Sequence, residues 1–586
     1  MVITAPLAAL RAHKGQRLTQ GLDDATVERL AKSHPDLVAA IEAAAVEHAR
    51  LQGEFAELFD LDEAAQLQAV QAGFVNFYAE DAVNPYIALA ARGPWVVSLN
   101  GAVLYDAGGY GMLGFGHTPE TMMKAMSRPQ VMANIMTPSL SQLRFDRALR
   151  KEIGHTRGGC PFTRFMCLNS GSESVGLAAR GPWVITLNGA VLYDAGGYGM
   201  LGFGHTPEAV MDAMSRPQVM ANIMTPSLSQ LRFDRALRKE IGHSRGGCPF
   251  ARFMCLNSGS ESVGLAARIA DINTKLQTDP GAKHAGRTVK RVVVKGSFHG
   301  RTERPALYSD SSRKAYQQHL ASYRNEDSVI AIEPYDADAL KQVFADAESK
   351  GWFVEAVFLE PVMGEGDPGR SVPPAFYAAA RELTRSHGSL FLVDSIQAGL
   401  RAHGVLSIVD YPGFEGLDAP DMETYSKALN AAQYPLSVLA MNERAAGLYR
   451  KGVYGNTMTT NPRALDVACA VLAQLSPQLR ENIRARGVEA VEKLEKLKSE
   501  LGGLITKVQG TGLLFSCELA PQFKCYGAGS TEEWLRQRGL NVIHGGANSL
   551  RFTPHFNLGS DELDLLVGMV GQALREGPRA TQAEAA

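Results

Sequence analysis

The sequence predicts an α/β protein with two folded parts. The larger part should contain a mainly parallel sheet, because short β-rich runs alternate with helical pattern, as in strand–helix–strand units whose sheet is covered on both faces. These runs are "RVVVKG" at 291–296, "VEAVFLEP" at 354–361 and "GSLFLVD" at 388–394. The smaller part should be α+β, because the pattern after Asn461 is helical to about Leu501 and then gives shorter strands and a final helix.

The segments around these strands support the same fold class. Residues 24–75 carry apolar residues three and four apart, which predicts helices. Between the second and third runs, "PPAFYAAARELTRSHG" predicts a helix that a glycine ends. Open parallel sheets bind ligands beyond the carboxyl ends of their strands. The residues that follow each strand are therefore the candidates for chemistry.

The composition is that of an ordinary globular protein, with 45% hydrophobic and 20% charged residues. A formal net charge of −2 gives no electrostatic footprint for nucleic acid or an anionic membrane, so we expect neither as a partner. No apolar run approaches the length of a transmembrane helix, and the first residues lack the pattern of a signal peptide. The seven cysteines show no CxxC pair or metal-ligand spacing. We therefore expect a cytoplasmic protein with reduced thiols and no metal site.

A long internal repeat interrupts this organisation. Residues 92–179 match residues 180–267 at 81 of 88 positions, and the tetrapeptide "LAAR" stands at all three junctions. Such identity between two long copies indicates a tandem duplication rather than a solenoid, whose units are shorter, more numerous and more divergent. The chain is accordingly divided into a helical N-terminal extension (1–91), the first copy (92–179), the second copy leading into the large domain (180–267), the large domain itself (268–460) and the C-terminal small domain (461–586).

Two polar features lie at predicted element ends. Gly259-Ser260-Glu261 opens a helix, and the first N–H groups of a helix have no intrahelical partner, so they can bind phosphate or serve as an ordinary cap. Asp394 ends the apolar run "SLFLV". A carboxylate at that edge of the sheet could be a metal ligand, a helix cap or the partner of a cationic ring.

A lysine and an aromatic ring complete the set. Lys427 lies in "TYSKALN", between a loop and an apolar run, although a single lysine is commonly solvated surface. Phe298 in "GSFHGRT" follows another predicted strand. Together the four features are the contacts that pyridoxal 5′-phosphate needs, because lysine forms its Schiff base and a carboxylate keeps its ring nitrogen protonated.

The motifs resemble those of the class III pyridoxal-phosphate aminotransferases, the ornithine, acetylornithine and 4-aminobutyrate group. In family order they are "NSGSES", "SFHGRT", "LEPVMGEGDPG", "LVDSIQAGLRAHG", "YSKAL", "YGNTMTTNP" and "SLRFTP", and with one copy of the repeat they cover roughly residues 92–560. The resemblance implies a fold type I, aspartate aminotransferase-like enzyme. It also implies a homodimer with shared active sites and amino transfer from an amino acid or ω-amino donor to a 2-oxo acid, 2-oxoglutarate above all.

The resemblance also implies roles for individual residues. Lys427 would be the Schiff-base lysine and proton shuttle, and Asp394 the partner of the ring nitrogen. The other cofactor contacts would be Gly259 and Ser260 at the phosphate, Phe298, His299 and Gln397 at the ring, and Thr457 from the other subunit. The substrate contacts would be Arg301 for a carboxylate, and Glu365 with Arg551 as a switch pair that admits either an amino-bearing or a carboxylate-bearing side chain.

Three positions depart from the family pattern, so substrate specificity does not carry over. Ser395 stands where the family usually has glutamate, "NAAQ" replaces a glycine-rich stretch after the lysine, and "MTT" stands where glycines are usual. The same fold also supports racemases, aminomutases and decarboxylases. A degenerate, non-catalytic paralogue whose site the duplication has broken is a further alternative.

The second copy is predicted to be the working one. In the first copy, Gly181-Pro182 follow the phosphate-loop helix after "SESVGLAAR", and proline disfavours helix there. In the second copy the helix continues for several turns. We therefore predict that Gly259-Ser260 bind the cofactor and that Gly171-Ser172 do not. Either the strands of the first copy stay in place while the second supplies the helix, or the first copy loops out whole.

Overall fold

The computed structural model extends over the whole chain. The residues that it describes are 4–12, 15–52, 56–66, 85–86, 88–92, 94–106, 140–165, 179–180, 182–185, 191–196, 200, 202–205, 207–215, 228–324, 327–431, 434–450, 453–454 and 462–580. None of the helices in these ranges has the length and apolar content that a bilayer crossing requires.

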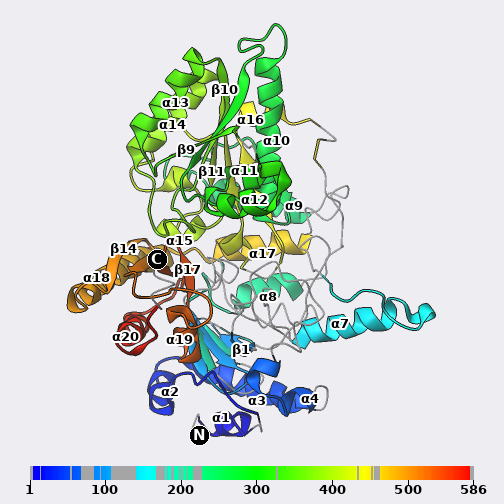
Figure 1. Ribbon diagram of the computed structural model, residues 1–586, viewed down its shortest axis with the longest axis vertical. Coiled ribbons are helices and arrows are strands. Elements are labelled where there is room, and N and C mark those ends of the chain that lie inside the picture. The colour runs from blue at the N-terminus through cyan, green and yellow to red at the C-terminus, as the bar shows by residue number, and fades with distance from the viewer. Residues whose placement is uncertain are drawn as a thin grey trace.

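The large part of the molecule is built on a seven-stranded sheet, which lies in the upper half of Figure 1. In spatial order its strands are β7 (Arg252–Leu256), β13 (Ser437–Met441), β12 (Met422–Tyr425), β11 (Leu390–Asp394), β10 (Trp352–Leu359), β8 (Thr288–Val294) and β9 (Val329–Ile332). The five strands from β12 to β9 run parallel, and β13 and β7 are antiparallel to their neighbours. The mainly parallel sheet expected from the sequence is therefore confirmed.

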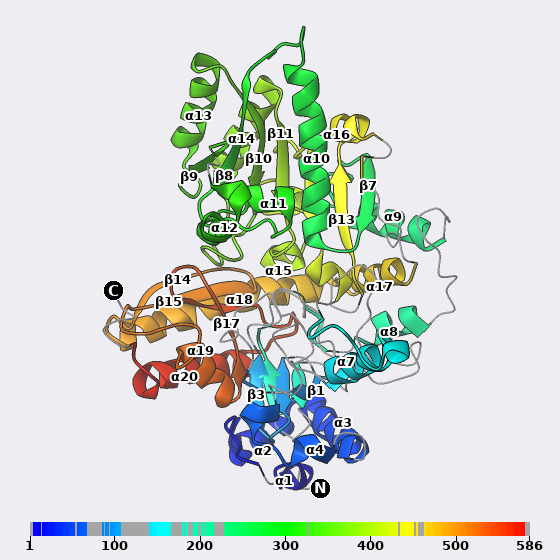
Figure 2. The ribbon, with the colours of Figure 1, turned by 45° about the vertical axis from the view of Figure 1, so that its right-hand side comes forward.

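Helices cover both faces of this sheet (Figures 1 and 2). They are α10 (Gly259–Thr278), α11 (Glu303–Tyr308), α13 (Ala337–Ser349), α14 (Pro374–His387) and α16 (Glu443–Leu448), and α12 (Arg313–His319) and α15 (Gly399–His403) lie near the lower end of the sheet in these views. Neighbouring strand residues point to opposite faces. Val293 and Leu392 pack in the core beneath α10, whereas Val292 and Phe391 pack in the core shared with α13 and α14. This double burial explains why the strands are apolar throughout.

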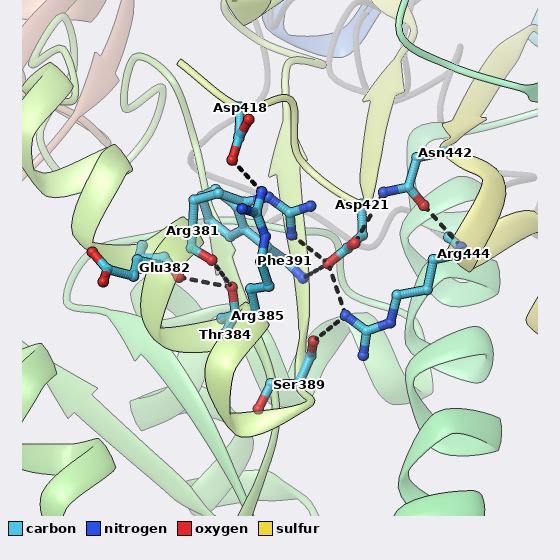
Figure 3. A network of polar contacts seen from close by, with 12 residues as sticks. Arg381, Glu382, Thr384, Arg385, Ser389, Phe391, Asp418, Asp421, Asn442 and Arg444 are labelled. Carbon is cyan, nitrogen blue, oxygen red and sulfur yellow. Dashed lines mark hydrogen bonds and ion pairs between the residues drawn. The ribbon is translucent and has the colours of Figure 1, made fainter.

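A buried carboxylate ties three strands together at one end of the sheet (Figure 3). Asp421 accepts hydrogen bonds from Arg381 Nη1 at 2.9 Å, from the Phe391 backbone N–H at 3.0 Å and from Asn442 Nδ2 at 3.0 Å. Phe391 lies on β11, Asp421 precedes β12 and Asn442 follows β13. This contact fixes the amino-terminal ends of β11 and β12, so their carboxyl ends are held in register at the opposite edge.

The smaller part follows the predicted order of elements. Two helices, α17 (Pro462–Ala473) and α18 (Pro477–Glu500), precede an antiparallel sheet and are followed at the end of the chain by α20 (Ser560–Glu576). The sheet contains β14 (Ile505–Thr511), β15 (Leu514–Leu519), β18 (Ser549–Phe552) and β17 (Ile543–Gly545), with α19 (Thr531–Gln537) and β16 (Leu540–Asn541) in the connection. Short 3₁₀ turns are η2 (His155–Arg157), η3 (Asp310–Ser312), η4 (Ala321–Tyr323), η5 (Ile408–Asp410) and η6 (Lys427–Asn430).

The N-terminal segment is helical, with one correction to the predicted division. Its helices are α1 (Thr4–Leu10), α2 (Asp24–Ala31), α3 (Pro35–Gln52) and α4 (Ala56–Phe59). The segment 1–91 is not helical to its end, because β1 (Ala88–Arg92) crosses the boundary. The boundaries at 179/180 and 267/268 likewise fall inside β4 (Ala179–Arg180) and α10. Repeat boundaries follow sequence identity, and elements end where backbone pairing ends.

One helix of the repeat is placed differently in the two copies. In the second copy, α8 (Glu208–Ser215) and α9 (Leu228–Glu240) pack against α17, and the chain continues into β7 and α10. In the first copy, α7 (Leu140–Glu152), the helix identical in sequence to α9, projects from the body of the molecule (Figure 1). Phe233 of α9 is 2% exposed and its twin Phe145 of α7 is 44% exposed.

The first halves of the copies each form a hairpin beside β16. The first-copy hairpin is β2 (Trp95–Ser98) with β3 (Val103–Asp106), and the second is β5 (Trp183–Ile185) with β6 (Val191–Asp194). Their strands pair with β1, β4 and β16. The helix expected to run to residue 180 is corrected, because Ala179–Arg180 form a strand. Residues 166–178, which include Gly171 and Ser172, lie outside the described residues.

Candidate active site

Four parallel strands bring polar residues to one edge of the sheet. Phe298 and His299 follow β8, Glu360 follows β10, Asp394 ends β11 and Lys427 lies just past β12. The strands are neighbours in the sheet and run in the same direction, so these residues meet at the carboxyl edge. This is the edge where open parallel sheets bind ligands.

Asp394 is buried and held by three donors. Its carboxylate accepts hydrogen bonds from the backbone N–H of Ile396 at 3.1 Å and from Thr424 Oγ1 at 3.2 Å, and it lies 2.8 Å from His299 Nδ1. Thr424 is the residue opposite Asp394 in the β11–β12 pairing. The other ring nitrogen of His299, Nε2, is buried and has no hydrogen-bond partner among the described residues. The aspartate is therefore fixed in place, and the histidine has a ring nitrogen available for a bound group.

The surroundings of Lys427 make its amine ionise near neutral pH. Its φ of 51° places it in the left-handed region, directly after β12 and at the start of η6. Burial, together with the charge of Arg551, lowers its pKa to about 7, although the charges of Glu365, Asp394 and Glu360 act in the opposite direction. An amine with this pKa is neutral in a large fraction of molecules at pH 7, as a nucleophilic lysine must be.

Glu360 belongs to the site, and the sequence analysis missed it. Its carboxylate accepts the backbone N–H of Phe298 at 3.0 Å and that of Gly364 at 2.9 Å, so it fixes the loops after β8 and β10 together. Burial raises its pKa to about 7. The signal was present, since Glu360 directly follows an apolar strand just as Asp394 does.

A second missed carboxylate explains one departure from the family pattern. Glu423 lies fully buried on β12 and accepts Ser395 Oγ at 2.5 Å, Ser407 Oγ at 2.5 Å and the Ile408 backbone N–H at 2.9 Å. Burial raises its pKa to about 7. Ser395, which stands where the family usually has glutamate, is therefore a donor to a glutamate on the neighbouring strand.

The N-terminus of α10 points its first amides toward this edge. Ser258 caps the helix by accepting the Glu261 backbone N–H at 3.3 Å, and the Glu261 side chain accepts the Asn257 backbone N–H at 2.8 Å. The N–H groups of Gly259 and Ser260 precede the first intrahelical bond and can therefore bind an anion. A Cβ at Gly259 would lie 2.7 Å from Cδ1 of Ile396, so the helix end packs closely against the residues after Asp394.

Two arginines lie close to these residues. The Arg301 guanidinium lies 4.8 Å from the centre of the Phe298 ring and 3.4 Å from Glu365. Phe298, expected to stack on the cofactor ring, thus carries a cation on one face.

Arg551 occupies a more enclosed position. It is 4% exposed and donates to Gln397 Oε1 at 3.2 Å and to the Gly364 carbonyl. Gln397 Nε2 is buried without a partner among the described residues. Of the expected switch pair, Glu365 forms an ion pair with Arg301, and Arg551 lies beside the preceding residue, Gly364. Thr457 lies outside the described residues.

These residues fit pyridoxal phosphate. Asp394 would supply a fixed carboxylate for the ring nitrogen, Lys427 would supply an amine of lowered pKa, and the start of α10 would supply amides for a phosphate. The buried, unpartnered nitrogens of His299 and Gln397 are polar atoms that a bound group can satisfy. Within the described ranges, no three His, Cys, Asp or Glu side chains are grouped so as to hold a metal ion.

Comparison with known families and sequences agrees with this chemistry. The family model for aminotransferase class-III matches residues 177–574. An acetylornithine aminotransferase of Xanthomonas campestris is 31% identical over 314 residues, which are 53% of this chain and 71% of that protein. An ornithine aminotransferase of Bacillus cereus is 30% identical over 311 residues, 53% of this chain and 72% of that protein.

Solved structures share the fold. An ornithine aminotransferase from Toxoplasma gondii, with PLP described as partly occupying its active site, has a TM-score of 0.55 and 22% identity, covering 67% of this chain and 88% of that one. An N-acetylornithine aminotransferase from Stenotrophomonas maltophilia has a TM-score of 0.53 and 23% identity, covering 68% of this chain and 94% of that one.

Proposed function

The chain belongs to the class III aminotransferases, and from that premise we propose that it transfers the amino group of an ornithine-type ω-amino donor to 2-oxoglutarate. The chain is a pyridoxal-phosphate-dependent transaminase that takes an amino donor and a 2-oxo acid. When bound, the cofactor supplies an electron sink and carries the amino group between the two substrates. The choice of donor and acceptor is the part that we propose.

One observation supports the cofactor chemistry on which the proposal rests, namely the lysine and the aspartate at the ends of adjacent strands. Lys427 has a pKa of about 7, so its amine can take a proton from one carbon and return it to another at neutral pH. Asp394, fixed by Ile396 and Thr424, would be the carboxylate beside the cationic ring nitrogen of the cofactor. The two residues thus divide the work between proton transfer and charge stabilisation.

The two arginines support a dicarboxylate acceptor. Arg301 is partly exposed, and its pairing with Glu365 is long enough, at 3.4 Å, to be replaced by a substrate carboxylate. Arg551 is buried near Gln397 at the other side of the site. Guanidinium groups bind carboxylates with two parallel hydrogen bonds, so two arginines match the two carboxylates of 2-oxoglutarate.

Partners and the remaining site residues are part of the same proposal. We propose a cytoplasmic homodimer in which Thr457 of one subunit completes the phosphate site of the other. Gly259, Ser260, Phe298, His299 and Gln397 would contact the cofactor, and Glu365 with Arg551 would adjust the pocket to each substrate. A racemase, aminomutase or decarboxylase would use the same lysine and aspartate but would have no need of a second arginine.

The test is a visible absorbance titration of the purified protein. Without an acceptor, ornithine, acetylornithine, lysine and 4-aminobutyrate are added in turn. One donor should abolish the visible band of the lysine-bound cofactor, and 2-oxoglutarate should then restore it. Lys427→Ala should give no such cycle, and Glu382→Gln, an exposed charge change, should cycle like the parent. A band that shifts without loss would favour the isomerase or decarboxylase alternative, and a protein without the band would favour the degenerate paralogue.

A further inference from the structure

Two hairpins of the same chain occupy the same position beside β16. Leu540 pairs with Tyr105 of the first-copy hairpin and with Tyr193 of the second-copy hairpin. Asn541 pairs in the same way with Asp106 and Asp194. Each of these partner pairs is separated by 88 positions, the length of the repeat, so the hairpins meet β16 in the same register.

The two hairpins exclude each other sterically. The indole rings of Trp95 and Trp183 lie parallel with centroids 2.6 Å apart, whereas aromatic pairs pack with centroids about 4.5–7 Å apart. Tyr105 and Tyr193 overlap in the same way. Two rings cannot share this volume in one molecule, so one hairpin holds the place at a time.

The hairpins are also nearly equivalent in sequence. Residues 94–106 and 182–194 differ only at Val97/Ile185 and Ser98/Thr186. A methyl or methylene difference is a small, volume-changing substitution compared with the burial of a whole tryptophan. Neither hairpin therefore has a large advantage from its own residues.

The two hairpins are held beside β16 by contacts with different parts of the chain. The first-copy hairpin is held by the N-terminal segment, through Leu22 N–H to the Val103 carbonyl at 2.5 Å and Arg11 Nε to the Gly101 carbonyl at 2.6 Å. The second-copy hairpin is held by the C-terminal segment, where Tyr193 Oη lies 3.1 Å from Nε2 of His555. The same residues occupy the equivalent positions of the other copy. Either hairpin can therefore make both sets of contacts.

The chain can leave and re-enter the fold at more than one point. Ala91 pairs with Ala179, and Leu104 pairs with Leu192, again 88 positions apart. An 88-residue excursion can thus start before the hairpin, as residues 92–179, or after it, as residues 107–194, and in both cases its two ends lie side by side. Both excursions contain α7.

The second-copy helix α9, by contrast, has a place that α7 does not share. Asp410 accepts the Gly242 backbone N–H at 2.6 Å and Ser244 Oγ at 2.6 Å just after α9. Glu240 at the end of α9 pairs with Arg480 at 2.7 Å. These contacts join α9 to the body of the protein.

We propose that this protein has two native arrangements, which differ in the hairpin that occupies the place beside β16, while α9 is docked in both. The occupant is the 94–106 hairpin in one arrangement and the 182–194 hairpin in the other. The displaced hairpin lies in the excursion with α7. This inference does not depend on the proposed substrates.

Substitutions in one copy at a time test it in the full-length holoenzyme. Trp95→Ala and Trp183→Ala are made singly and together, and thermal unfolding is followed. Each single variant should melt within about 1 °C of the parent, because losing one of two equal arrangements is a twofold change in population, about 0.4 kcal/mol. The double variant should melt roughly 5 °C lower or fail to fold, because no intact hairpin is left to fill the core.

The helix pair provides the matched contrast. Phe233→Ala should lower the melting temperature by several degrees and Phe145→Ala should not, because Phe233 is buried and Phe145 is 44% exposed. If Trp95→Ala or Trp183→Ala alone gives the full loss, one hairpin is the sole occupant and the proposal is wrong. It is equally wrong if the double variant melts like the parent.

A direct measurement uses 5-fluorotryptophan and ¹⁹F NMR. The chain has four tryptophans, and Trp352 and Trp534 serve as references. Trp95 and Trp183 should each give a buried and an exposed signal, which Trp95→Phe and Trp183→Phe assign. A single buried signal for one of them and a single exposed signal for the other would overturn the proposal.

Discussion

Glu423 makes a pH dependence of stability that a single substitution should remove. Its carboxylate is fully buried, and burial raises its pKa to about 7 from an ordinary value of 4.5. Between these two pH values the unfolded chain has lost the proton and the folded protein still holds it. Stability therefore falls as pH rises through this window and changes no further above it.

The magnitude follows from that pKa difference. Each pKa unit corresponds to about 1.36 kcal/mol, so Glu423 should contribute ~3 kcal/mol of stability at pH 4.5 that is lost by pH 7.5. Glu423→Gln has no proton to lose in either state. An amide fits the site, because Ser407 can turn its hydroxyl from donor to acceptor while Ile408 still donates to the amide oxygen.

Thermal unfolding of the parent and of Glu423→Gln across pH 4.5–7.5 measures the effect. The parent should lose roughly 5 °C relative to the variant over that range. The raised pKa of Glu360 also makes stability fall as pH rises. Because Glu360 is present in both proteins, its contribution cancels in the difference between their melting temperatures. Glu382→Gln, which removes an exposed carboxylate, should show the same change of melting temperature with pH as the parent. If the melting temperatures of the parent and of Glu423→Gln differ by the same amount at every pH, the reasoning is refuted.

Three further predictions concern the site and the repeat. Asp394→Asn should lower kcat by at least about 10²-fold with little change in melting temperature, measured by steady-state kinetics, because an amide cannot hold the charge beside His299. Arg301→Lys should raise KM for the 2-oxo acid more than it lowers kcat, because lysine cannot form two parallel bonds to a carboxylate; an effect on kcat alone would contradict this role. Phe233→Ala should cost ~3–5 kcal/mol and Phe145→Ala under ~0.5 kcal/mol, and equal thermal shifts would show that both helices are docked.

Much of the fold and of the site could be predicted from local pattern. The strands at β8, β10 and β11 are continuous apolar runs, and the helix before β11 ends at Gly388 with φ 89°, as the sequence predicted. Asp394 was found because a carboxylate at the end of an apolar run stands out. Glu423 was not found, because its partners Ser395 and Ser407 are adjacent to it only across strands and loops.

Other features depend on tertiary contacts that no local pattern contains. The tetrapeptide "LAAR" ends strand β1 at residues 89–92 and continues helix α10 at residues 265–268. Its intrinsic preference is the same in both places. What differs is the neighbour, since β1 pairs with β2 while α10 packs over the sheet. Context therefore overrides propensity in one of the two.

The sequence by itself determined the family, the chemistry at the strand ends and the existence of two nearly identical copies. Only the tertiary structure decided how those copies differ. Identical sequences made both α7 and α9 helical, because helix formation is local. Docking is not local. α17, Asp410 and Arg480 offer one place for such a helix, α9 is joined directly to β7 and α10, and two helices cannot occupy the same volume.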